Sequence, residues 1–300
     1  MNKERLYVIV GLGEVLWDIF PKKKYLGGAP ANFAYYVSML GHRGIIASRI
    51  GKDELGKGIL DSLTDLSLTK EYIQIDPNNP TGTVDVEIDS KGQPKFTIKK
   101  NVAWDFLEFN EKFKQLAEGV DAVCFGSLAQ RSAISHNTII EFLKHTQNDT
   151  LKIFDINLRQ HFFSKSTLIE SLELSSILKL NDEELRTLMD LLGYKNKESE
   201  EEACKLLIEA YMLDLVCLTK GEKGSLLIND KEIVKHPGYK VTVADTVGTG
   251  DAFTAALVVK YLEGVSLKKI NESANKLASW VASKDGATPP INEYIKKEFL

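Results

Sequence analysis

Short apolar runs that alternate with helix-periodic stretches constrain the fold of this 300-residue sequence more than any other feature. Each run is followed by glycine or polar residues, a pattern typical of strands buried on both faces. The runs lie at 6–10, 44–48, 122–126, 152–156, 177–180 and 215–219. Between them, apolar residues recur with the helical period at 32–40, 134–146, 200–211 and 252–263. Strands that alternate with helices predict an α/β fold, with a largely parallel sheet covered by helices on both faces.

One region breaks this alternation and predicts a second, smaller sheet. Apolar and polar residues alternate strictly at 84–89 and 96–99, and Ser90–Pro94 between them reads as a hairpin loop. Residues 13–20 read as a further strand of the same half-covered sheet. A small sheet beside a large α/β domain is typical of a lid, and a surface hairpin without function is the alternative.

Composition fits one domain in an aqueous compartment. Hydrophobic residues make up 43% and charged residues 27%, enough for a sizeable core. We therefore expect a single domain over residues 1–300, with a β lid inserted from about 13–27 and 81–103. The net charge of −4 argues against a nucleic-acid partner. The three cysteines form no C-x-x-C pair, and no apolar run approaches the roughly 20 residues that cross a bilayer. These features predict a cytoplasmic protein without membrane contact.

Two common nucleotide-binding motifs are absent. Gly11 and Gly13 follow the first apolar run, but Leu16 stands where the dinucleotide fingerprint needs a third glycine. Gly51–Lys52 and Gly56–Lys57 lack the Ser or Thr that completes a Walker A loop. The sequence therefore argues against a nicotinamide-dependent oxidoreductase and against a P-loop enzyme.

A different phosphate-binding device precedes the helix predicted at 252–263. Gly248 and Gly250 come directly before this helix, where backbone N–H groups and the helix dipole favour an anion. Asp251 follows them, and Asp245 lies just upstream. An aspartate at a helix start is often only a cap, but a cap needs neither the glycines nor a second acid. The segment predicts phosphoryl transfer, with Asp251 accepting the proton of the attacking hydroxyl.

The segment Asp245–Phe253 resembles the C-terminal signature of the PfkB (ribokinase-like) carbohydrate kinases, with Thr249 in place of the usual alanine. Further family-like motifs follow the family's order along the chain: Gly27–Asn32, Gly41, Gly51–Gly56, Asp155–Arg159, Asn181–Glu184, Thr219–Gly224 and Asn275. Each motif alone is weak, but the ordered set is specific. The resemblance implies a ribokinase-like three-layer αβα sandwich with a small β-sheet lid. It also implies a kinase that transfers the γ-phosphoryl group of MgATP to a sugar hydroxyl.

The resemblance also assigns the catalytic and sugar-binding residues. Asp251 would act with the backbone of Gly248, Thr249 and Gly250. The sugar would be bound by Asp18, Gly27, Gly28, Asn32, Ala103 and Arg159. A carboxylate such as Asp18 can accept charge-assisted hydrogen bonds from two adjacent hydroxyls. Plainer interpretations stay open: an exposed strand acid for Asp18, a helix cap for Asn32 and a surface ion pair for Arg159.

The nucleotide and cation residues follow in the same way. ATP would contact Asn181, Thr219, Lys220, Gly221, Gly224 and Asn275. Asn181 and Glu184 would hold Mg²⁺ through water, although the same pair also reads as a helix capping box. A monovalent cation, K⁺, would lie among Asp245, Val247, Val281, Lys284 and Gly286. The charge of Lys284 counts against this last site.

Four segments most resemble the fructokinase branch: 13–21, 27–32, 101–105 and 125–131. They favour D-fructose as the substrate, with Trp17 or Trp104 as an apolar wall of the sugar site. Ribose, tagatose or 2-keto-3-deoxygluconate kinase activity stays open, as does a non-catalytic sugar or nucleotide sensor. The exposed strand edges of a lid are also consistent with a homodimer paired through the lids.

Overall fold

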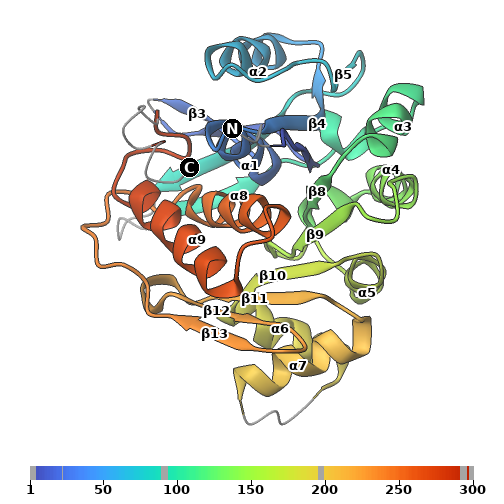
Figure 1. Cartoon of the computed structure of the whole chain (residues 1–300). Coiled ribbons are helices and arrows are strands. Elements are labelled where there is room, and N and C mark those ends of the chain that lie inside the picture. The colour runs from blue at the N-terminus through green and yellow to red at the C-terminus, as the bar shows by residue number, and fades with distance from the viewer. Residues whose placement is uncertain (1–4, 22, 89–93, 195–198, 291–295, 297–300) are drawn as a thin grey trace.

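A nine-stranded, mostly parallel sheet forms the centre of the fold in the described part of the chain (Figure 1). The structure, a computed structural model, describes residues 5–21, 23–88, 94–194, 199–290 and 296. In chain order the strands are β1 (Val8–Leu12), β4 (Arg43–Gly51), β5 (Ile73–Asp76), β8 (Ala122–Phe125), β9 (Leu151–Asp155), β10 (Ile177–Asn181), β11 (Leu215–Thr219), β12 (Ser225–Ile228) and β13 (Ile233–His236). Across the sheet they lie in the order β13-β12-β11-β10-β9-β8-β1-β4-β5. The β11–β12 and β12–β13 pairs are antiparallel, and the pairs from β11 to β5 are parallel.

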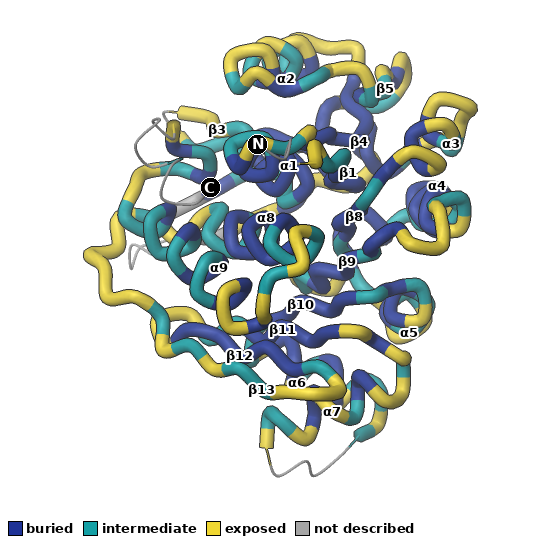
Figure 2. Tube along the Cα trace, viewed as in Figure 1, coloured by how far each residue is buried: buried dark blue, intermediate teal, exposed yellow. Residues whose placement is uncertain are grey.

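Helices cover both faces of this sheet. The side chains of α1 (Ala29–Met39), α2 (Glu54–Asp65), α8 (Thr249–Leu262) and α9 (Leu267–Ala282) join one buried cluster. Those of α3 (Glu111–Glu118), α4 (Ala133–Lys144), α5 (Lys165–Glu173), α6 (Asp182–Leu192) and α7 (Glu200–Tyr211) join the other. Successive residues of β1 supply both clusters, since Ile9 faces the first and Val10 the second. The predicted three-layer αβα sandwich is confirmed, and Figure 2 shows the buried layers.

A small sheet lies beside the large one and has the order β3-β2-β6-β7. Its strands are β2 (Leu16–Ile19), β3 (Lys24–Gly27), β6 (Gly82–Ile88) and β7 (Pro94–Ile98). β2 and β6 are parallel, and the two outer pairs are antiparallel. Val84, Val86 and Ile98 are buried against the main core, whereas Phe96 is exposed. The half-covered character predicted for this sheet is therefore confirmed. Of the predicted hairpin loop, residues 90–93 lie outside the described residues.

Several element boundaries differ from the sequence prediction, and two of these differences bear on the site. The first strand was predicted at 6–10 but runs from Val8 to Leu12, because Gly11 continues the strand instead of ending it. A Cβ atom at Gly11 would lie 2.2 Å from the carbonyl oxygen of Pro30, so glycine is what lets α1 pack against β1. The next helix was predicted from Asn32 but begins at Ala29, after Gly28. Asn32 is therefore not a helix cap, and its side chain is free to face the interior.

Part of the family-like glycine motif joins the small sheet to the main domain. Asp53 caps α2, accepting the N–H of Gly56 at 2.7 Å. It also accepts the N–H and the hydroxyl of Thr81, which precedes β6, at 2.8 and 2.6 Å. A Cβ atom at Gly51 would lie 2.5 Å from the Thr81 nitrogen. These residues hold the start of β6 against α2.

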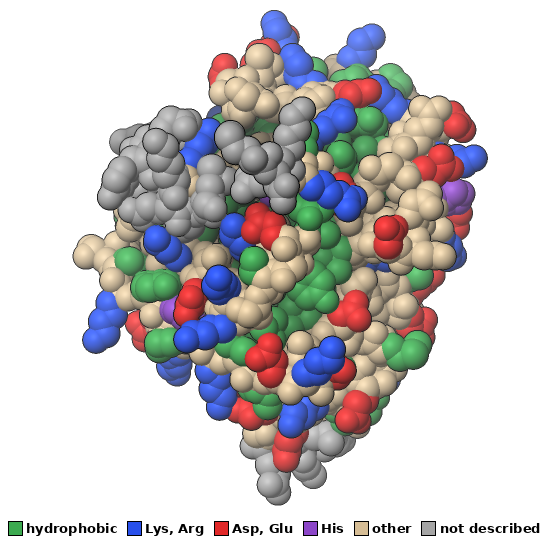
Figure 3. Space-filling view, in the orientation of Figure 1, with side chains coloured by type: hydrophobic (Ala, Val, Ile, Leu, Met, Phe, Trp, Pro, Cys, Tyr) green, Lys and Arg blue, Asp and Glu red, His purple; other side chains and the backbone are tan. Residues whose placement is uncertain are grey.

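Charged side chains of both signs are interspersed on the face shown in Figure 3. None of the helices in the described ranges combines the length and apolar character that crossing a bilayer requires.

Candidate active site

The carboxyl ends of two central strands meet the start of α8. Asp155 ends β9 and Asn181 ends β10, and these strands are parallel neighbours. A Cβ atom at Gly250, in the first turn of α8, would lie 3.3 Å from the Nζ atom of Lys179 on β10. Ligands of open α/β sheets bind at such strand ends. The elements thus gather at the edge where a site is expected.

The two glycines of the predicted anion nest occupy the helix start. Gly248 caps α8 with a φ angle of +77°, and a Cβ atom there would lie 2.4 Å from the carbonyl oxygen of Ala287. Its position therefore requires glycine on both conformational and steric grounds. The hydroxyl of Thr249 donates to the carbonyl of Thr246 at 2.8 Å, closing the turn. Threonine in place of alanine thus fits the nest without changing its backbone.

Asp251 lies in the first turn of α8 and faces α1. Its Oδ2 atom accepts a hydrogen bond from Asn32 Nδ2 at 2.8 Å. Loss of water contact raises the pKa of Asp251 to about 6, although the Asn32 amide opposes the rise, and the nearby Asp155 adds to it. The Oδ1 atom of Asn32 is buried without a hydrogen-bond partner in the described protein. The pair combines a carboxylate with raised proton affinity and a buried acceptor that is left unpaired.

A buried ion pair beneath the nest was not predicted. Lys179 Nζ donates to Asp155 Oδ1 at 3.0 Å, and the Thr254 hydroxyl donates to Asp155 Oδ2 at 3.1 Å. Burial alone would lower the pKa of Lys179, but the carboxylates of Asp155 and Glu184 raise it above its usual value. Lys179 is therefore a fixed positive charge under the anion nest. Its sequence signal is a lysine within the apolar strand 177–180, because a charge in a central strand needs a partner.

Glu14 is the second residue that sequence reasoning missed. Its side chain is 3% exposed and lines a small cavity together with Asp155 and Asp251. Burial raises the pKa of Glu14 to about 7, and the charge of Asp251 adds to this rise. The available signal in the sequence was a glutamate between a glycine and a valine, Gly13 and Val15.

The sugar-side residues partly converge. Burial raises the pKa of Asp18 to about 6, and Arg159 opposes that rise. A Cβ atom at Gly27 would lie 2.4 Å from Asp18 Oδ2, and one at Gly28 would lie 2.5 Å from the carbonyl oxygen of Glu14. Arg159 is exposed, yet it also lowers the pKa of Glu14 and Asp251, so its charge lies near all three carboxyl groups.

The proposed apolar wall is wrong for this structure. Trp104 is fully buried under the guanidinium of Arg131, which lies 4.0 Å above its ring. Trp17 points to the opposite strand face from Asp18, and its Nε1 atom donates to the carbonyl of Leu55 on α2 at 2.9 Å. Ala103 likewise has no exposed surface. These three side chains pack the protein interior.

Of the predicted nucleotide residues, Asn181 and Thr219 end the neighbouring strands β10 and β11 and are paired there, whereas Asn275 lies on α9. The Lys220 ammonium is bound by Glu200 at 2.7 Å, as a surface lysine would be. Asn275 is buried, and its Nδ2 atom donates to Ser225 Oγ at 2.7 Å and also to Asn271. Gly221 and Gly224 have φ angles of +55° and +80°, in the turn that joins β11 and β12.

Asn181 and Glu184 form the capping box of α6. Each accepts the backbone N–H of the other at 2.8 Å, and Glu184 also accepts the N–H of Leu158 at 2.9 Å. Within the described residues, no cluster of three or more acidic, histidine or cysteine side chains could hold a metal. Both side chains nevertheless keep oxygen lone pairs, which fits a metal bound mainly by water and phosphate oxygens.

The two segments predicted to hold a monovalent cation are in contact. Asp245 accepts the N–H of Val247 at 3.0 Å and that of Gly286 at 3.2 Å. The Val281 carbonyl accepts the N–H of Lys284 at 2.9 Å. The Lys284 ammonium lies 5.8 Å from the centre of the Trp280 ring and pairs with its π face.

Comparison with known proteins identifies the family. A model of the pfkB family carbohydrate kinases matches residues 17–293. An uncharacterized sugar kinase from Pyrococcus horikoshii is 31% identical over 96% of this chain and 95% of its own, and its structure in complex with ATP superposes with a TM-score of 0.84. The 5-dehydro-2-deoxygluconokinase of Clostridium botulinum is 27% identical, covering 99% of this chain and 95% of its own. The fructokinase of Salmonella typhimurium is 26% identical, covering 82% of each. The chain therefore belongs to the pfkB family of carbohydrate kinases and is a phosphotransferase.

Proposed function

We propose that the protein transfers the γ-phosphoryl group of MgATP to a hydroxyl of D-fructose, giving fructose 6-phosphate. The main support for phosphoryl transfer is the position of Asp251, which Asn32 holds by a hydrogen bond at the glycine-rich start of α8. A carboxylate with a pKa of about 6 is ionised at neutral pH and still accepts a proton readily. The hydroxyl oxygen forms a bond to the γ-phosphorus while Asp251 takes its proton and ADP leaves.

The nest and the buried lysine would stabilise the transferring group. The backbone N–H groups of Gly248 and Gly250 lie at the helix start, where the helix dipole is positive. The Thr249 N–H donates to the carbonyl of Thr246 at 3.3 Å and would exchange this acceptor for a phosphate oxygen. Lys179 adds a fixed positive charge below Gly250. Electrostatic stabilisation of developing phosphoryl charge is the main task of a kinase site.

The sugar would bind between the small sheet and α1. Asp18, held against Gly27, can accept two sugar hydroxyls, and the unpaired Asn32 Oδ1 can accept a third. Gly28 permits close approach and Ala29 leaves room for a hexose, while Arg159 adds charge at the mouth. Fructose is favoured by the fructokinase-like segments, and the similarity to 5-dehydro-2-deoxygluconokinase keeps acidic and deoxy sugars in the test panel.

ATP would lie over the ends of β10 and β11, along Thr219, Lys220, Gly221 and Gly224, with adenosine beside Asn275. Mg²⁺ would be held through water by Asn181 and Glu184, where it would neutralise phosphate charge. The ammonium group of Lys220 would leave Glu200 and bind a phosphate oxygen instead.

Potassium would bind beside the nest. Its ligands would be Asp245, Gly286 and the backbone of Val247, Val281 and Lys284. The free, buried cysteines are consistent with action in the cytoplasm.

The small sheet would act as the lid. Its β7 strand is linked across to the β9–α5 connection, because Gln160 donates to the carbonyl of Phe96 at 2.8 Å. We expect residues 96–100 to become protected from hydrogen exchange when sugar binds; unchanged exchange would rule out lid closure.

The outer strands of the small sheet, β3 and β7, leave edges through which two copies would pair. A purely monomeric sedimentation profile at working concentration would rule out this homodimer.

The substrate proposal is tested by coupled ADP release across a sugar panel. The panel holds fructose, ribose, tagatose, 2-keto-3-deoxygluconate and 5-dehydro-2-deoxygluconate, with Mg²⁺ and with or without K⁺. Fructose should give the highest kcat/KM, and phosphorus NMR of the product should show a 6-phosphate ester. A higher kcat/KM for any other sugar would overturn the fructose assignment and name its replacement.

A further inference from the structure

A small cavity joins two carboxyl groups behind the nest. It measures about 10 Å³, near the lower limit for one water molecule, and is lined by Glu14, Asp155 and Asp251 among other residues. Asp155 is neutralised by Lys179 at 3.0 Å. Glu14 and Asp251 line the same cavity, and within the described residues neither has such a cation in hydrogen-bond contact, so they are its two uncompensated acids.

The Glu14 carboxyl is only partly satisfied. The N–H groups of Ala29, at the start of α1, and of Glu14 itself stabilise its charged form. Its Oε2 atom, by contrast, is buried without a hydrogen-bond partner in the described protein. A buried carboxylate oxygen with no partner is costly, whereas a protonated carboxyl is much less so. The geometry therefore favours a proton on Glu14.

The groups around Glu14 reinforce this state. Asp251 on α8 raises its pKa, and Arg159 after β9 lowers it less than burial raises it, leaving the value at about 7. Cys124 on β8 also lines the cavity, and burial raises the pKa of its thiol well above the usual value, so it stays neutral. Two like charges in a poorly solvated space titrate as a coupled pair.

We propose that Glu14 and Asp251 share one proton across this cavity, with Glu14 a positioning residue that carries it while Asp251 acts as the ionised base. The proposal rests on the role of Asp251 given above. During transfer the sugar hydroxyl passes its proton to Asp251, and Glu14 keeps its own. When Glu14 ionises, a second negative charge lies beside the anionic transition state and slows the reaction.

The first test is the pH dependence of kcat/KM for the wild type and Glu14→Gln. The wild-type rate should rise as Asp251 loses its proton and fall as Glu14 loses its own. In Glu14→Gln the fall due to Glu14 should disappear, while the acid limb should stay within about half a pH unit of the wild type, because Glu14 is already neutral when Asp251 ionises. Asp76→Asn, which alters a buried acid remote from the cavity, should keep the wild-type profile. Superimposable profiles for Glu14→Gln and wild type would overturn the proposal.

The second test needs no catalysis. Because the folded-state pKa of Glu14 is raised above the unfolded value of 4.5, its contribution to stability is lost as pH rises through about 7. The fall in melting temperature between about pH 6 and pH 8 should be smaller in Glu14→Gln and in Asp251→Asn than in the wild type. In the double variant the reduction of this fall should be less than the sum of the two single reductions, because either change removes the same shared proton. Additive changes would overturn the shared proton. Non-additive changes in a protein whose Asp251→Asn variant kept the wild-type rate would support the shared proton and overturn only the base assignment.

Discussion

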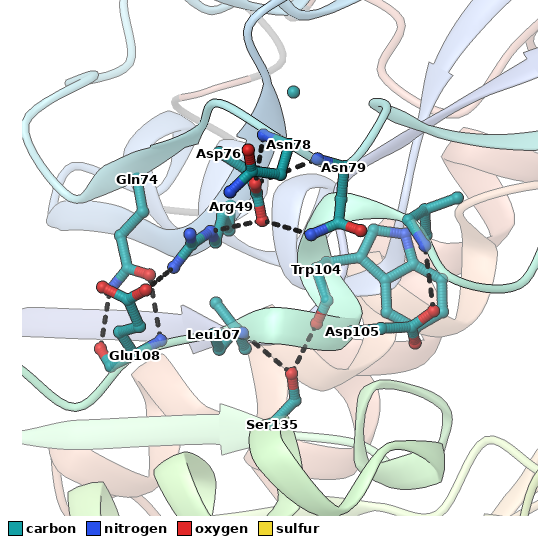
Figure 4. Close-up of polar contacts among 12 residues, drawn as sticks. Arg49, Gln74, Asp76, Asn78, Asn79, Trp104, Asp105, Leu107, Glu108 and Ser135 are labelled. Carbon is teal, nitrogen blue, oxygen red and sulfur yellow. Dashed lines mark hydrogen bonds and ion pairs between the residues drawn. The ribbon is translucent and has the colours of Figure 1, made fainter.

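Two regions of this protein hold acids that are wholly or partly removed from water, and the two regions bond these acids in opposite ways. At the sheet edge (Figure 4), Asp76 accepts the N–H groups of Asn78 and Asn79 and lies 3.0 Å from Arg49 Nε. At the candidate site, Asp251 accepts a hydrogen bond from Asn32, and Glu14 Oε2 accepts none from the described residues. Both regions remove carboxylates from water, but only the first replaces the lost hydration.

The pKa values follow this difference. Burial alone would raise the pKa of Asp76, but its hydrogen bonds and Arg49 bring it below the usual value. Burial dominates at Glu14, Asp18 and Asp251, and their pKa values are raised to about 7, 6 and 6. Acids that hold the fold together are fully bonded, whereas acids that await a ligand keep their acceptors free and reduce stability in its absence.

The largest expected effect separates function from stability at Asp251. Asp251→Asn should lower kcat by about 10³-fold, since a general base contributes roughly 10² to 10⁴. At about pH 8 the variant should be no less stable than the wild type, because the raised pKa means that the charged form is disfavoured there. Steady-state ADP release and urea unfolding measure the two quantities.

Glu54→Gln provides the control for this substitution, since Glu54 is also a first-turn acid, on α2. It should leave kcat unchanged. An Asp251→Asn enzyme within tenfold of the wild-type rate would refute the base assignment.

The next effect is structural and falls on the sheet edge. Asp76→Ala leaves two N–H groups without acceptors and removes one carboxylate from Arg49, so the free energy of unfolding should fall by about 3 kcal/mol. Glu108 contacts the same guanidinium at 2.6 Å but is 64% exposed, so Glu108→Ala should cost less than about 1 kcal/mol. Urea titration of both variants compares them directly. Equal losses would mean that bonding and burial do not distinguish the two acids.

This comparison also shows what a sequence can predict. The nest and Asp251 are local: two glycines and an acid at a helix start carry their own geometry, and the structure puts Gly248 at the cap as expected. Lys179 is important because it forms an ion pair with Asp155, 24 positions away in the chain. No local sequence pattern predicts this contact. The same holds for Glu14, whose neighbour Asp251 belongs to the far end of the sequence.

Motifs also predicted residues whose side chains the fold uses elsewhere. Ala103 and Trp104 start a short turn that is buried under Arg131, because the small sheet folds back onto the core there. The side-chain amide of Asn275 donates hydrogen bonds to Ser225 and Asn271. The motifs predicted that these residues belong to the site, but the packing of the fold determines which of their atoms remain available to a ligand.

A smaller effect tests whether Asp18 is held by Gly27 of the neighbouring strand β3, two positions beyond its paired residue Tyr25. A methyl group at Gly27 would lie 2.4 Å from Asp18 Oδ2, so Gly27→Ala should displace the carboxylate and raise the KM for sugar by about tenfold. The KM for ATP should not change. Gly119→Ala, whose methyl group has nothing nearer than 3.7 Å, is the matched control. An unchanged sugar KM would show that Asp18 does not bind the sugar from this position.

The smallest expected effect is a difference in sign between two changes in unfolding free energy at pH 8. The folded-state pKa of Asp18 is raised, so its stabilising contribution is complete below 3.8 and is lost as pH rises through about 6. Asp18→Asn should therefore raise the unfolding free energy at pH 8 by about 1 kcal/mol, allowing for the solvent that reaches this carboxylate, and change little near pH 4. The pKa of Asp76 is lowered, so Asp76→Asn should be most harmful at neutral pH and progressively less harmful as the wild type loses its own charge in acid. Urea unfolding across this pH range should give difference curves of opposite sign at pH 8. Curves of the same sign there would mean that Asp18 is as well bonded as Asp76, and the distinction between the two regions would fail.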